Sequence, residues 1–364
     1  MRKTISIFNN KGGVGKTSLC WNVADSLARK DKKVLLVDFD PQCNLSIAVL
    51  GEDTFVNILP TVNQPYGATI RAFLQRFLQN TGGEEVFIHK GRYTHQNVDL
   101  VAGDFWLNVY AESLNVGADL LSGTGLSRFV VLDTLVDKIQ KANNIQYDYV
   151  LIDLPPSFGS LVRAAFYSSD YFIVPCTSDN FSVYCVGLIG QMVPNFIQDW
   201  DSGLGRFKGS NPHFTDFDTL GMPKFGGWIF NGFDTSRERR TSQEIAAGVA
   251  QKEKVMVRAD RTFHERIENA ITNDLVNVLN TKITRYNPVS NTLNGDFQIG
   301  ATEDANVLIQ NSLWQNVPIS QLDQFQQVTT LQDRINWAPN QIEQIHLLRD
   351  AFNQIAENVI INCN

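Results

Sequence analysis

A glycine-rich loop near the amino terminus constrains the fold of this chain more than any other feature. The loop and the residue after it read Lys11-Gly12-Gly13-Val14-Gly15-Lys16-Thr17-Ser18. A short apolar run, 4–8, precedes the loop, and a helical pattern of apolar residues begins at Thr17. Glycines let backbone N–H groups approach phosphate oxygens without Cβ clashes, and the start of the following helix adds unpaired donors. The order strand, glycine loop, helix therefore predicts a phosphate-binding site in an α/β protein.

The residue types in this loop indicate that its ligand is a nucleoside triphosphate with Mg²⁺. The Lys16 ammonium would reach the β- and γ-phosphates as a point charge, and the Thr17 hydroxyl would ligate the metal. The predicted nucleotide-binding residues of the loop are Lys11, Gly12, Gly13, Val14, Gly15, Lys16, Thr17 and Ser18. A glycine-rich turn without a ligand is the alternative, but it does not explain the lysine, the threonine and the flanking elements together.

Strand and helix patterns alternate along the rest of the chain, which predicts a doubly wound, mostly parallel sheet flanked by helices. Continuous apolar runs, typical of strands covered on both faces, occur at 34–37, 149–152, 171–174 and 227–230. Helical patterns lie at about 129–142, 162–168 and 341–361. We expect one domain over residues 1–364, with insertions at about 52–97, 195–224 and 280–300, the first of them containing one helix at 70–78.

Acidic residues follow two of the predicted strands. Asp38 and Asp40 close the strand at 34–37, and Asp153 closes the strand at 149–152. Side chains two residues apart in a strand face the same side, so both Asp38 and Asp40 can point at the phosphate loop. An acid after an apolar strand is the Walker B arrangement, in which Asp153 would hold Mg²⁺ through a water. The alternative roles are strand-end caps for the first two acids and a helix cap for Asp153.

The loop resembles that of the ParA/MinD family of P-loop ATPases, and most closely the ParA-type partition ATPases. The usual eight-residue pattern begins with Gly, whereas this chain has Asn10 there and an additional lysine, Lys11, which makes it a deviant Walker A motif. The resemblance implies ATP and Mg²⁺ as cofactors, and a sandwich homodimer that forms on ATP binding. In such a dimer Lys11 would contact the nucleotide of the partner subunit.

The resemblance also implies roles for particular residues. Asp40 would position the attacking water near the metal, so the expected catalytic residues are Lys11, Lys16 and Asp40, and the expected metal site consists of Thr17, Asp40 and Asp153. Asn231 stands where the family often reads the nucleotide base, although a turn residue before Gly232 is the alternative. Cys43 departs from the family, which usually has a small residue, often Gly, at that position.

The function implied by the resemblance is a slow, partner-stimulated ATPase that drives segregation of plasmid or chromosomal DNA with a ParB-like or centromere-binding adaptor protein. The basic segment 237–266 has eight Lys or Arg and five acids, and could bind DNA non-specifically. A solvated surface of mixed charge is the alternative for this segment. Two other functions remain open: a ParA-like positioning or regulatory switch that binds a protein cargo rather than DNA, and a P-loop metabolic enzyme.

Composition narrows the location and the partners. The formal net charge of −7 excludes a generally basic nucleic-acid coat but leaves room for a local basic patch. No run of about 18 apolar residues and no signal-peptide pattern is present, so we expect a cytoplasmic protein, associated with the nucleoid if it binds DNA. Residues 303–364 contain seven acids and two bases, a balance unsuited to a membrane-binding tail, so we expect no membrane partner and read the last helix as core packing. The odd number of cysteines, five, argues against a disulfide framework.

Overall fold

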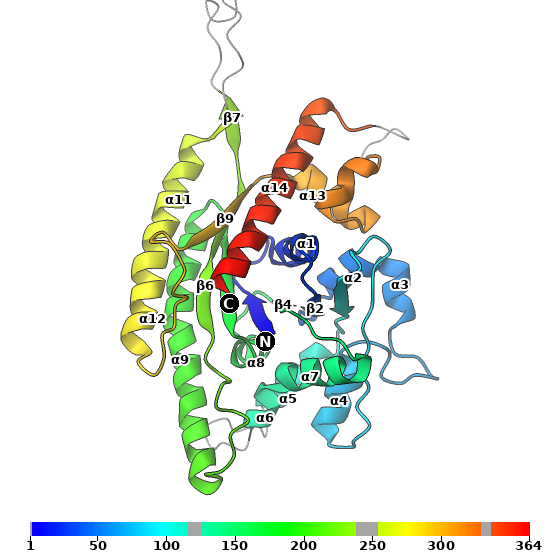
Figure 1. Ribbon diagram of the computed structural model, residues 1–364, viewed down its shortest axis with the longest axis vertical. Coiled ribbons are helices and arrows are strands. Elements are labelled where there is room, and N and C mark those ends of the chain that lie inside the picture. Colours follow the sequence, from blue (N-terminus) through cyan, green and yellow to red (C-terminus); the bar gives the residue numbers. More distant parts are fainter. Residues whose placement is uncertain (1, 116–124, 238–253, 329–335) are drawn as a thin grey trace, which may run out of the picture.

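A seven-stranded parallel sheet forms the centre of the computed structural model, which describes residues 2–115, 125–237, 254–328 and 336–364. The strand order is β3-β2-β4-β1-β5-β6-β9, and every neighbouring pair is parallel (Figure 1). The strands are β1 (Lys3–Ile7), β2 (Val34–Asp38), β3 (Val98–Val101), β4 (Tyr149–Asp153), β5 (Tyr171–Cys176), β6 (Lys224–Phe233) and β9 (Gln298–Glu303). An antiparallel hairpin of β7 (Thr235–Arg237) and β8 (Lys254–Met256) continues from β6. The predicted doubly wound fold is confirmed.

Helices cover both faces of the sheet (Figure 1). They are α1 (Lys16–Ala28), α2 (Asn44–Leu50), α3 (Glu52–Asn57), α4 (Arg71–Gln79), α5 (Leu107–Asn115), α6 (Leu126–Phe129), α7 (Val131–Asn143), α8 (Ser160–Tyr167), α9 (Asn180–Ser210), α11 (Arg258–Ala270), α12 (Asn277–Lys282), α13 (Asn306–Gln315) and α14 (Pro339–Asn362). A π-helical turn, η1 (Ile271–Val276), joins α11 to α12, and a 3₁₀ turn, η2 (Ile319–Gln324), follows α13. None of the helices described is long and apolar enough to cross a bilayer.

The two layers of helices explain why the strands are continuously apolar. In β2, Leu35 and Val37 belong to one buried cluster, with α4, α5, α7, α8 and α9. Val34 and Leu36 belong to the cluster on the other face, with α1, α2 and α14. Successive side chains of a strand point to opposite faces, so a strand covered on both sides needs apolar residues at every position.

The structure corrects several expected elements. The insertion at 52–97 holds two helices, α3 and α4, rather than one. The segment 195–224 is not a separate insertion over its first half, because α9 continues to Ser210 with Pro194 inside it. Buried apolar residues at helical spacing, among them Phe196, Trp200 and Leu204, hold that half against the core, although the Gly, Asp and Phe content of the segment conceals the pattern.

The carboxyl-terminal helix α14 was predicted within two residues at its start, and most of its apolar stripe is core as expected. The buried members are Ile345, Leu348, Phe352, Ile355 and Val359. Ile342 is the exception, since its side chain is 37% exposed. All five cysteines are free and buried.

Candidate functional site

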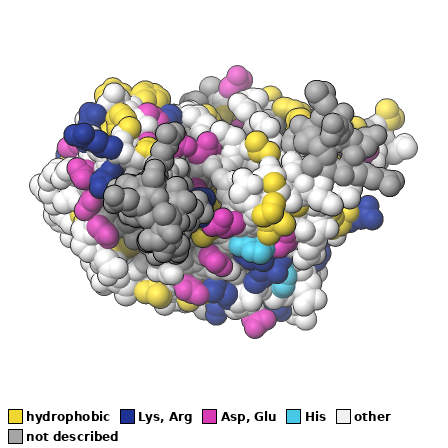
Figure 2. Space-filling view, turned by 90° about the horizontal axis from the view of Figure 1, so that it is seen from above, with side chains coloured by type: hydrophobic (Ala, Val, Ile, Leu, Met, Phe, Trp, Pro, Cys, Tyr) yellow, Lys and Arg dark blue, Asp and Glu magenta, His cyan; other side chains and the backbone are white. Residues whose placement is uncertain are grey.

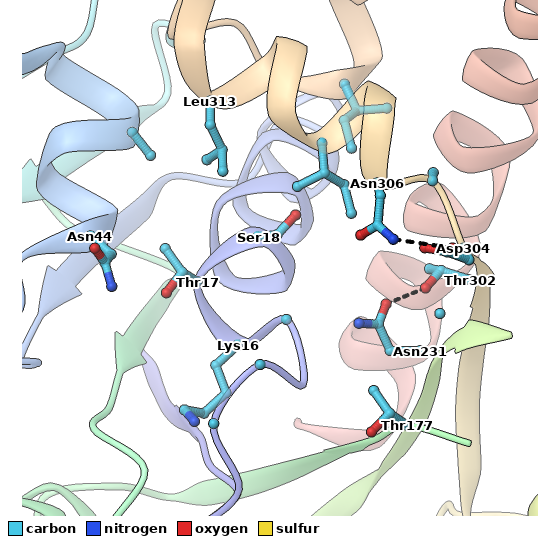
Figure 3. Close-up of a pocket in the computed structure, with 18 of the residues that line it drawn as sticks. Lys16, Thr17, Ser18, Asn44, Thr177, Asn231, Thr302, Asp304, Asn306 and Leu313 are labelled. Carbon is cyan, nitrogen blue, oxygen red and sulfur yellow. Dashed lines mark hydrogen bonds between the residues drawn. The ribbon is translucent and has the colours of Figure 1, made fainter. Parts of the chain in front are cut away.

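A pocket of about 780 Å³ opens at the carboxyl ends of the parallel strands. In open α/β sheets, ligands bind outside these strand ends, where the strand order reverses. One wall is the glycine loop and the start of α1, and the opposite wall comes from Thr177, Asn231 and 302–306 (Figure 3). Apolar side chains of α2, α13 and α14 close the remaining side. The pocket therefore combines a polar, loop-lined end with an apolar end, as a nucleotide site requires.

The backbone of the glycine loop has the form that a phosphate cradle needs. Gly13 and Gly15 have φ angles of 75° and 80°, in the left-handed region that favours glycine. A Cβ on Gly15 would lie 2.4 Å from Asn231 Nδ2, so a larger residue would also collide with the opposite wall. Among the described residues no side chain caps the start of α1, which leaves the first N–H groups of this helix available to an anion.

The two lysines of the loop occupy different places. Lys16 lines the pocket, and its Nζ donates to the carbonyl oxygens of Asn9 and Lys11, each at 3.1 Å. Burial lowers the pKa of Lys16, although Asp153 and Asp40 oppose this shift. Lys11 does not line the pocket, and its contact with the partner subunit's nucleotide stays a prediction.

Lys11 is held by the loop between β5 and α9, which the sequence analysis did not single out. Its Nζ donates to Thr177 Oγ1 at 2.6 Å and forms an ion pair with Asp179. Asp179 also caps α9, because its Oδ1 accepts from Ser182 N at 2.9 Å. A rule that polar residues follow parallel strands, applied after β5, would have identified Thr177 and Asp179.

Asp153 and Thr17 meet at the phosphate end of the pocket. Thr17 Oγ1 donates to Asp153 Oδ2 at 2.7 Å, whereas Asp153 Oδ1 is buried with no hydrogen-bond partner among the described residues. Burial, together with the nearby Asp38 and Asp40, raises the pKa of Asp153 to about 8. A hydroxyl and a carboxylate with a free buried oxygen are hard donors of the kind that Mg²⁺ takes, so these residues fit the predicted metal.

Only one of the two acids at the end of β2 and just beyond it lines the pocket, which corrects the expectation that both point at the phosphate loop. Asp40 lines the pocket, and its Oδ1 accepts from Gln42 N at 2.9 Å. Asp38 is fully buried, and its Oδ2 accepts from Ser46 N at 2.8 Å and from Ser46 Oγ at 2.6 Å. The strand ends at Asp38 and the chain then turns into α2, so the alternation of strand side chains no longer applies.

The turn between Asp40 and α2 places Cys43 in a conformation that favours glycine. Cys43 precedes α2 with a φ of 57°, in the left-handed region. Glycine adopts this conformation without the steric cost that a Cβ adds. Cys43 accepts that strain in a fully buried position.

Asn231 lies at the pocket wall, where its amide connects two segments. Its Nδ2 donates to Val14 O at 2.9 Å, and its Oδ1 accepts from Thr302 Oγ1 (Figure 3). The Nδ2 of Asn231 has a second hydrogen and its Oδ1 has a second lone pair, and either could bind a base. Base recognition by Asn231 stays a prediction. The Val14 side chain is buried and does not line the pocket, so only the backbone of Val14 could contact the nucleotide. Asp304 and Asn306, after β9, were missed because the polar strand β9 lies at the edge of an expected loop, 280–300.

The basic segment 237–266 is described only in part, because residues 238–253 lie outside the described residues. Arg237 pairs with Glu343 at 2.9 Å, and Lys254 pairs with Glu303 at 3.4 Å. The exposed arginines of the described part are on α11: Arg258, Arg261 and Arg266. Both basic residues of the described hairpin strands are therefore paired with acids.

Comparison with known proteins finds a family model and relatives that match the amino-terminal half of the chain. A model of the family described as "AAA domain" matches residues 2–204. A virulence plasmid ParA family protein of Chlamydia psittaci is 32% identical over 186 residues, which are 50% of this chain and 59% of the relative. The sporulation initiation inhibitor protein Soj of Bacillus subtilis is 30% identical over 183 residues, which are 50% of this chain and 61% of Soj. The matched part thus spans about three fifths of the length of these curated relatives.

Solved structures resemble most or nearly all of the chain at low sequence identity. A protein of Corynebacterium diphtheriae has a TM-score of 0.62 at 21% identity, covering 88% of this chain and 98% of that one. The ATP complex of a Cyanothece McdA variant has a TM-score of 0.56 at 16% identity, covering 99% and 97%. A putative plasmid partition protein of Borrelia burgdorferi bound to AMPPNP has a TM-score of 0.52 at 16% identity, covering 99% of each chain. These likenesses establish a shared fold.

Proposed function

The chain belongs to the AAA-domain family as a ParA-type P-loop ATPase, and from this premise we propose that it binds ATP with Mg²⁺, pairs with a second copy, and hydrolyses the nucleotide slowly. The observation that supports this most is that Lys16, Thr17 and Asp40 line one end of the pocket, and that the buried Asp153 is hydrogen-bonded to Thr17 there. This is the set of charges and donors that phosphoryl transfer needs around a triphosphate.

Each residue has a distinct part in this proposal. The loop amides and Lys16 bind the phosphates and stabilise the charge that develops on them. Thr17 and Asp153 hold Mg²⁺, which when bound neutralises charge on the β- and γ-phosphates. Asp40 orients the attacking water and accepts its hydrogen bond. The proposal assigns no arginine of the same chain to the phosphates. Hydrolysis is therefore slow until a second copy or a partner protein orders the site.

The placement of Lys11 supports the proposed dimerisation. Within one chain this lysine is paired with Asp179 rather than with the pocket. A triphosphate carries more charge than one carboxylate, so a second copy that brings its nucleotide close can take Lys11 from Asp179. Loss of the γ-phosphate removes that advantage, and the lysine returns to its own chain. The nucleotide state then controls whether two copies stay together.

We further propose that this cycle serves DNA segregation, with a ParB-like or centromere-binding adaptor protein as the stimulating partner. The proposal is supported by relatives that carry the ParA name, by a similar fold in a putative plasmid partition protein, and by exposed arginines on α11. Binding to DNA through these arginines would be electrostatic and would weaken steeply with salt.

Calorimetry with ATP and Mg²⁺ tests the nucleotide part of the proposal. The unchanged protein should bind ATP, and Lys16→Ala should weaken that binding at least about 100-fold, because a buried ammonium aimed at phosphate contributes several kcal/mol. Lys33→Ala, which removes an exposed lysine outside the pocket, is the matched control and should bind normally. Equal ATP binding by Lys16→Ala and the unchanged protein would refute the site.

A salt-titrated DNA retention assay, with and without ATP, tests the biological part. Retention that needs ATP and falls with salt supports partition. Stimulation by a protein cargo without any retention on DNA would identify a positioning switch instead, and a rate that rises only with a small molecule would identify a metabolic enzyme. None of these outcomes bears on the proposed ATP site, which the calorimetry tests separately.

A further inference from the structure

One carboxylate outside the pocket, that of Asp260, joins two of the three segments that form the wall opposite the glycine loop. Ser178 Oγ donates to Asp260 Oδ1 at 2.5 Å, and Asp234 N donates to Asp260 Oδ2 at 2.6 Å. Ser178 belongs to the loop between β5 and α9, and Asp234 lies between β6 and β7. Each oxygen therefore holds a different segment, and charge-assisted hydrogen bonds of this kind are among the stronger ones in proteins.

Both segments carry residues that face the nucleotide. Thr177, next to Ser178, lines the pocket, and so do Asn231 and Gly232, just before Asp234. The first segment also holds Lys11, through Thr177 and Asp179. A change in the partner of Lys11 thus acts on the two residues that flank Ser178, whose hydroxyl donates to Asp260.

On its other side, Asp260 is part of the surface at the base of the hairpin. It lies in the first turn of α11, directly after the hairpin strand β8. Val257 N donates to Asp234 O at 3.0 Å, which closes the base of the hairpin beside the Asp260 bond. Arg258 and Arg261, on the same turn of α11, are exposed. In Figure 2, which views this end of the molecule, Lys and Arg side chains lie in small groups, at the upper left and below the centre, with Asp and Glu side chains among them.

We infer that Asp260 couples the nucleotide pocket to the β7–β8 hairpin and the first turn of α11, so that the partner chosen by Lys11 changes how Arg258 and Arg261 are presented to DNA phosphates. The inference rests on the proposed function, because it uses the exchange of Lys11 between Asp179 and a phosphate. Asp260 touches no nucleotide in this scheme and is a positioning residue. Because the same carboxylate is hydrogen-bonded to both segments, a displacement of one segment is passed to the other.

Hydrogen exchange measures this coupling directly in the full chain. In the unchanged protein, Mg²⁺ and ATP should change the exchange rates of amides at 233–237 and 254–262 by at least about threefold. Asp260→Asn and Ser178→Ala should each reduce that change to less than about 1.5-fold, while the ATP affinity measured by calorimetry stays within about twofold. Ser178→Ala removes one of the two hydrogen bonds of Asp260 without altering any charge. It therefore distinguishes an effect of the hydrogen bond from an effect of the charge of Asp260.

Matched controls lie on the same helix. Glu265→Gln removes one negative charge from the exposed face of α11, and Thr262→Ala removes a hydroxyl that bonds only to Arg258 O of its own helix. Both controls should keep the ATP-dependent exchange of the unchanged protein. If Asp260→Asn and Glu265→Gln behave alike, the effect is one of charge and the inference is wrong. It is also wrong if Ser178→Ala leaves the ATP-dependent change intact.

DNA retention gives the second measurement. ATP should tighten retention of the unchanged protein by about tenfold or more, a usual size for coupling between two sites, and Asp260→Asn should bring the ratio of the two affinities close to one. Absence of ATP binding would remove the proposed function and the inference together. Normal ATP binding without any change in hairpin exchange would overturn the inference alone. An Asp260-dependent exchange response without DNA retention would support the coupling and refute DNA as the partner.

Discussion

Replacing Asp153 by Asn should stabilise the nucleotide-free protein, although the same change should impair its use of Mg²⁺. Asp153 is 1% exposed, and one of its oxygens has no hydrogen-bond partner among the described residues. Its strand position pairs in register with that of Asp38, a second buried acid whose pKa burial raises to about 7. Without a cation, this end of the pocket concentrates negative charge in a dry environment, which opposes folding.

The size of the effect follows from the raised pKa. Burial moves the pKa of Asp153 from 3.8 to about 8, and at about 1.4 kcal/mol per pKa unit this limits the cost of the charged form to roughly 5 kcal/mol at pH 8. Relaxation and water penetration reduce such costs, so we expect Asp153→Asn to raise the free energy of unfolding by about 2–3 kcal/mol at pH 8.

The sign of the pH dependence follows in the same way. Because the folded-state pKa lies above the ordinary one, the folded chain binds more protons than the unfolded chain between about pH 4 and pH 8. The stability of the unchanged protein should therefore fall as pH rises through this window, and Asp38 should contribute in the same direction. At pH 5, only about one pH unit above the ordinary carboxyl value, the gain from Asp153→Asn should shrink to about 1 kcal/mol.

Urea unfolding at pH 5 and pH 8, followed by circular dichroism, measures both effects. Addition of Mg²⁺ and ATP should stabilise the unchanged protein at pH 8 more than it stabilises Asp153→Asn. Asp99→Asn is the matched control, because Asp99 is a buried sheet acid with partners, Lys90 Nζ at 2.9 Å and Tyr147 OH at 2.8 Å. That variant should be less stable by about 1 kcal/mol or more. Destabilisation by Asp153→Asn at both pH values would refute the reasoning.

Three further variants test the site. Asp40→Ala should bind ATP but hydrolyse it at least about 100-fold more slowly, because the water loses its orienting group; a normal rate of phosphate release would contradict that role. Lys11→Ala should bind ATP as a monomer, which light scattering would show, and a dimer that still forms with ATP would contradict the contact in trans. Gly15→Ala should lose ATP binding, since its φ is 80° and its Cβ would lie 2.4 Å from Asn231 Nδ2; calorimetry that finds unchanged affinity would contradict the cradle geometry.

The phosphate end of the pocket could be predicted because its parts are local in the sequence. Seven consecutive residues, 11–17, make the loop, and the acids follow apolar runs that can only be buried strands. The parallel sheet then brings those strand ends to one edge without further information. Asp38 was misjudged for a local reason as well. The prediction extended strand alternation past the last strand residue, into a turn that the sequence does not mark with a glycine.

The end of the pocket at Asn231 and 302–306, which is the proposed base end, could not be predicted in the same way, because it depends on contacts between distant segments. The strand β9 reads Gln298–Glu303 with Ile299 as its one large apolar residue, so it has no apolar run to recognise. It lies at the sheet edge, where a strand needs fewer buried side chains. What places it is α14, which approaches so closely that a Cβ on Gly300 would lie 2.2 Å from Ile355 Cγ1. A helix near the end of the chain thus positions β9. Residues 304–306, which follow β9, therefore reach the pocket only once that helix has packed against the sheet. The phosphate end and the base end are thus specified by different kinds of information, the first by adjacent residues and the second by tertiary packing.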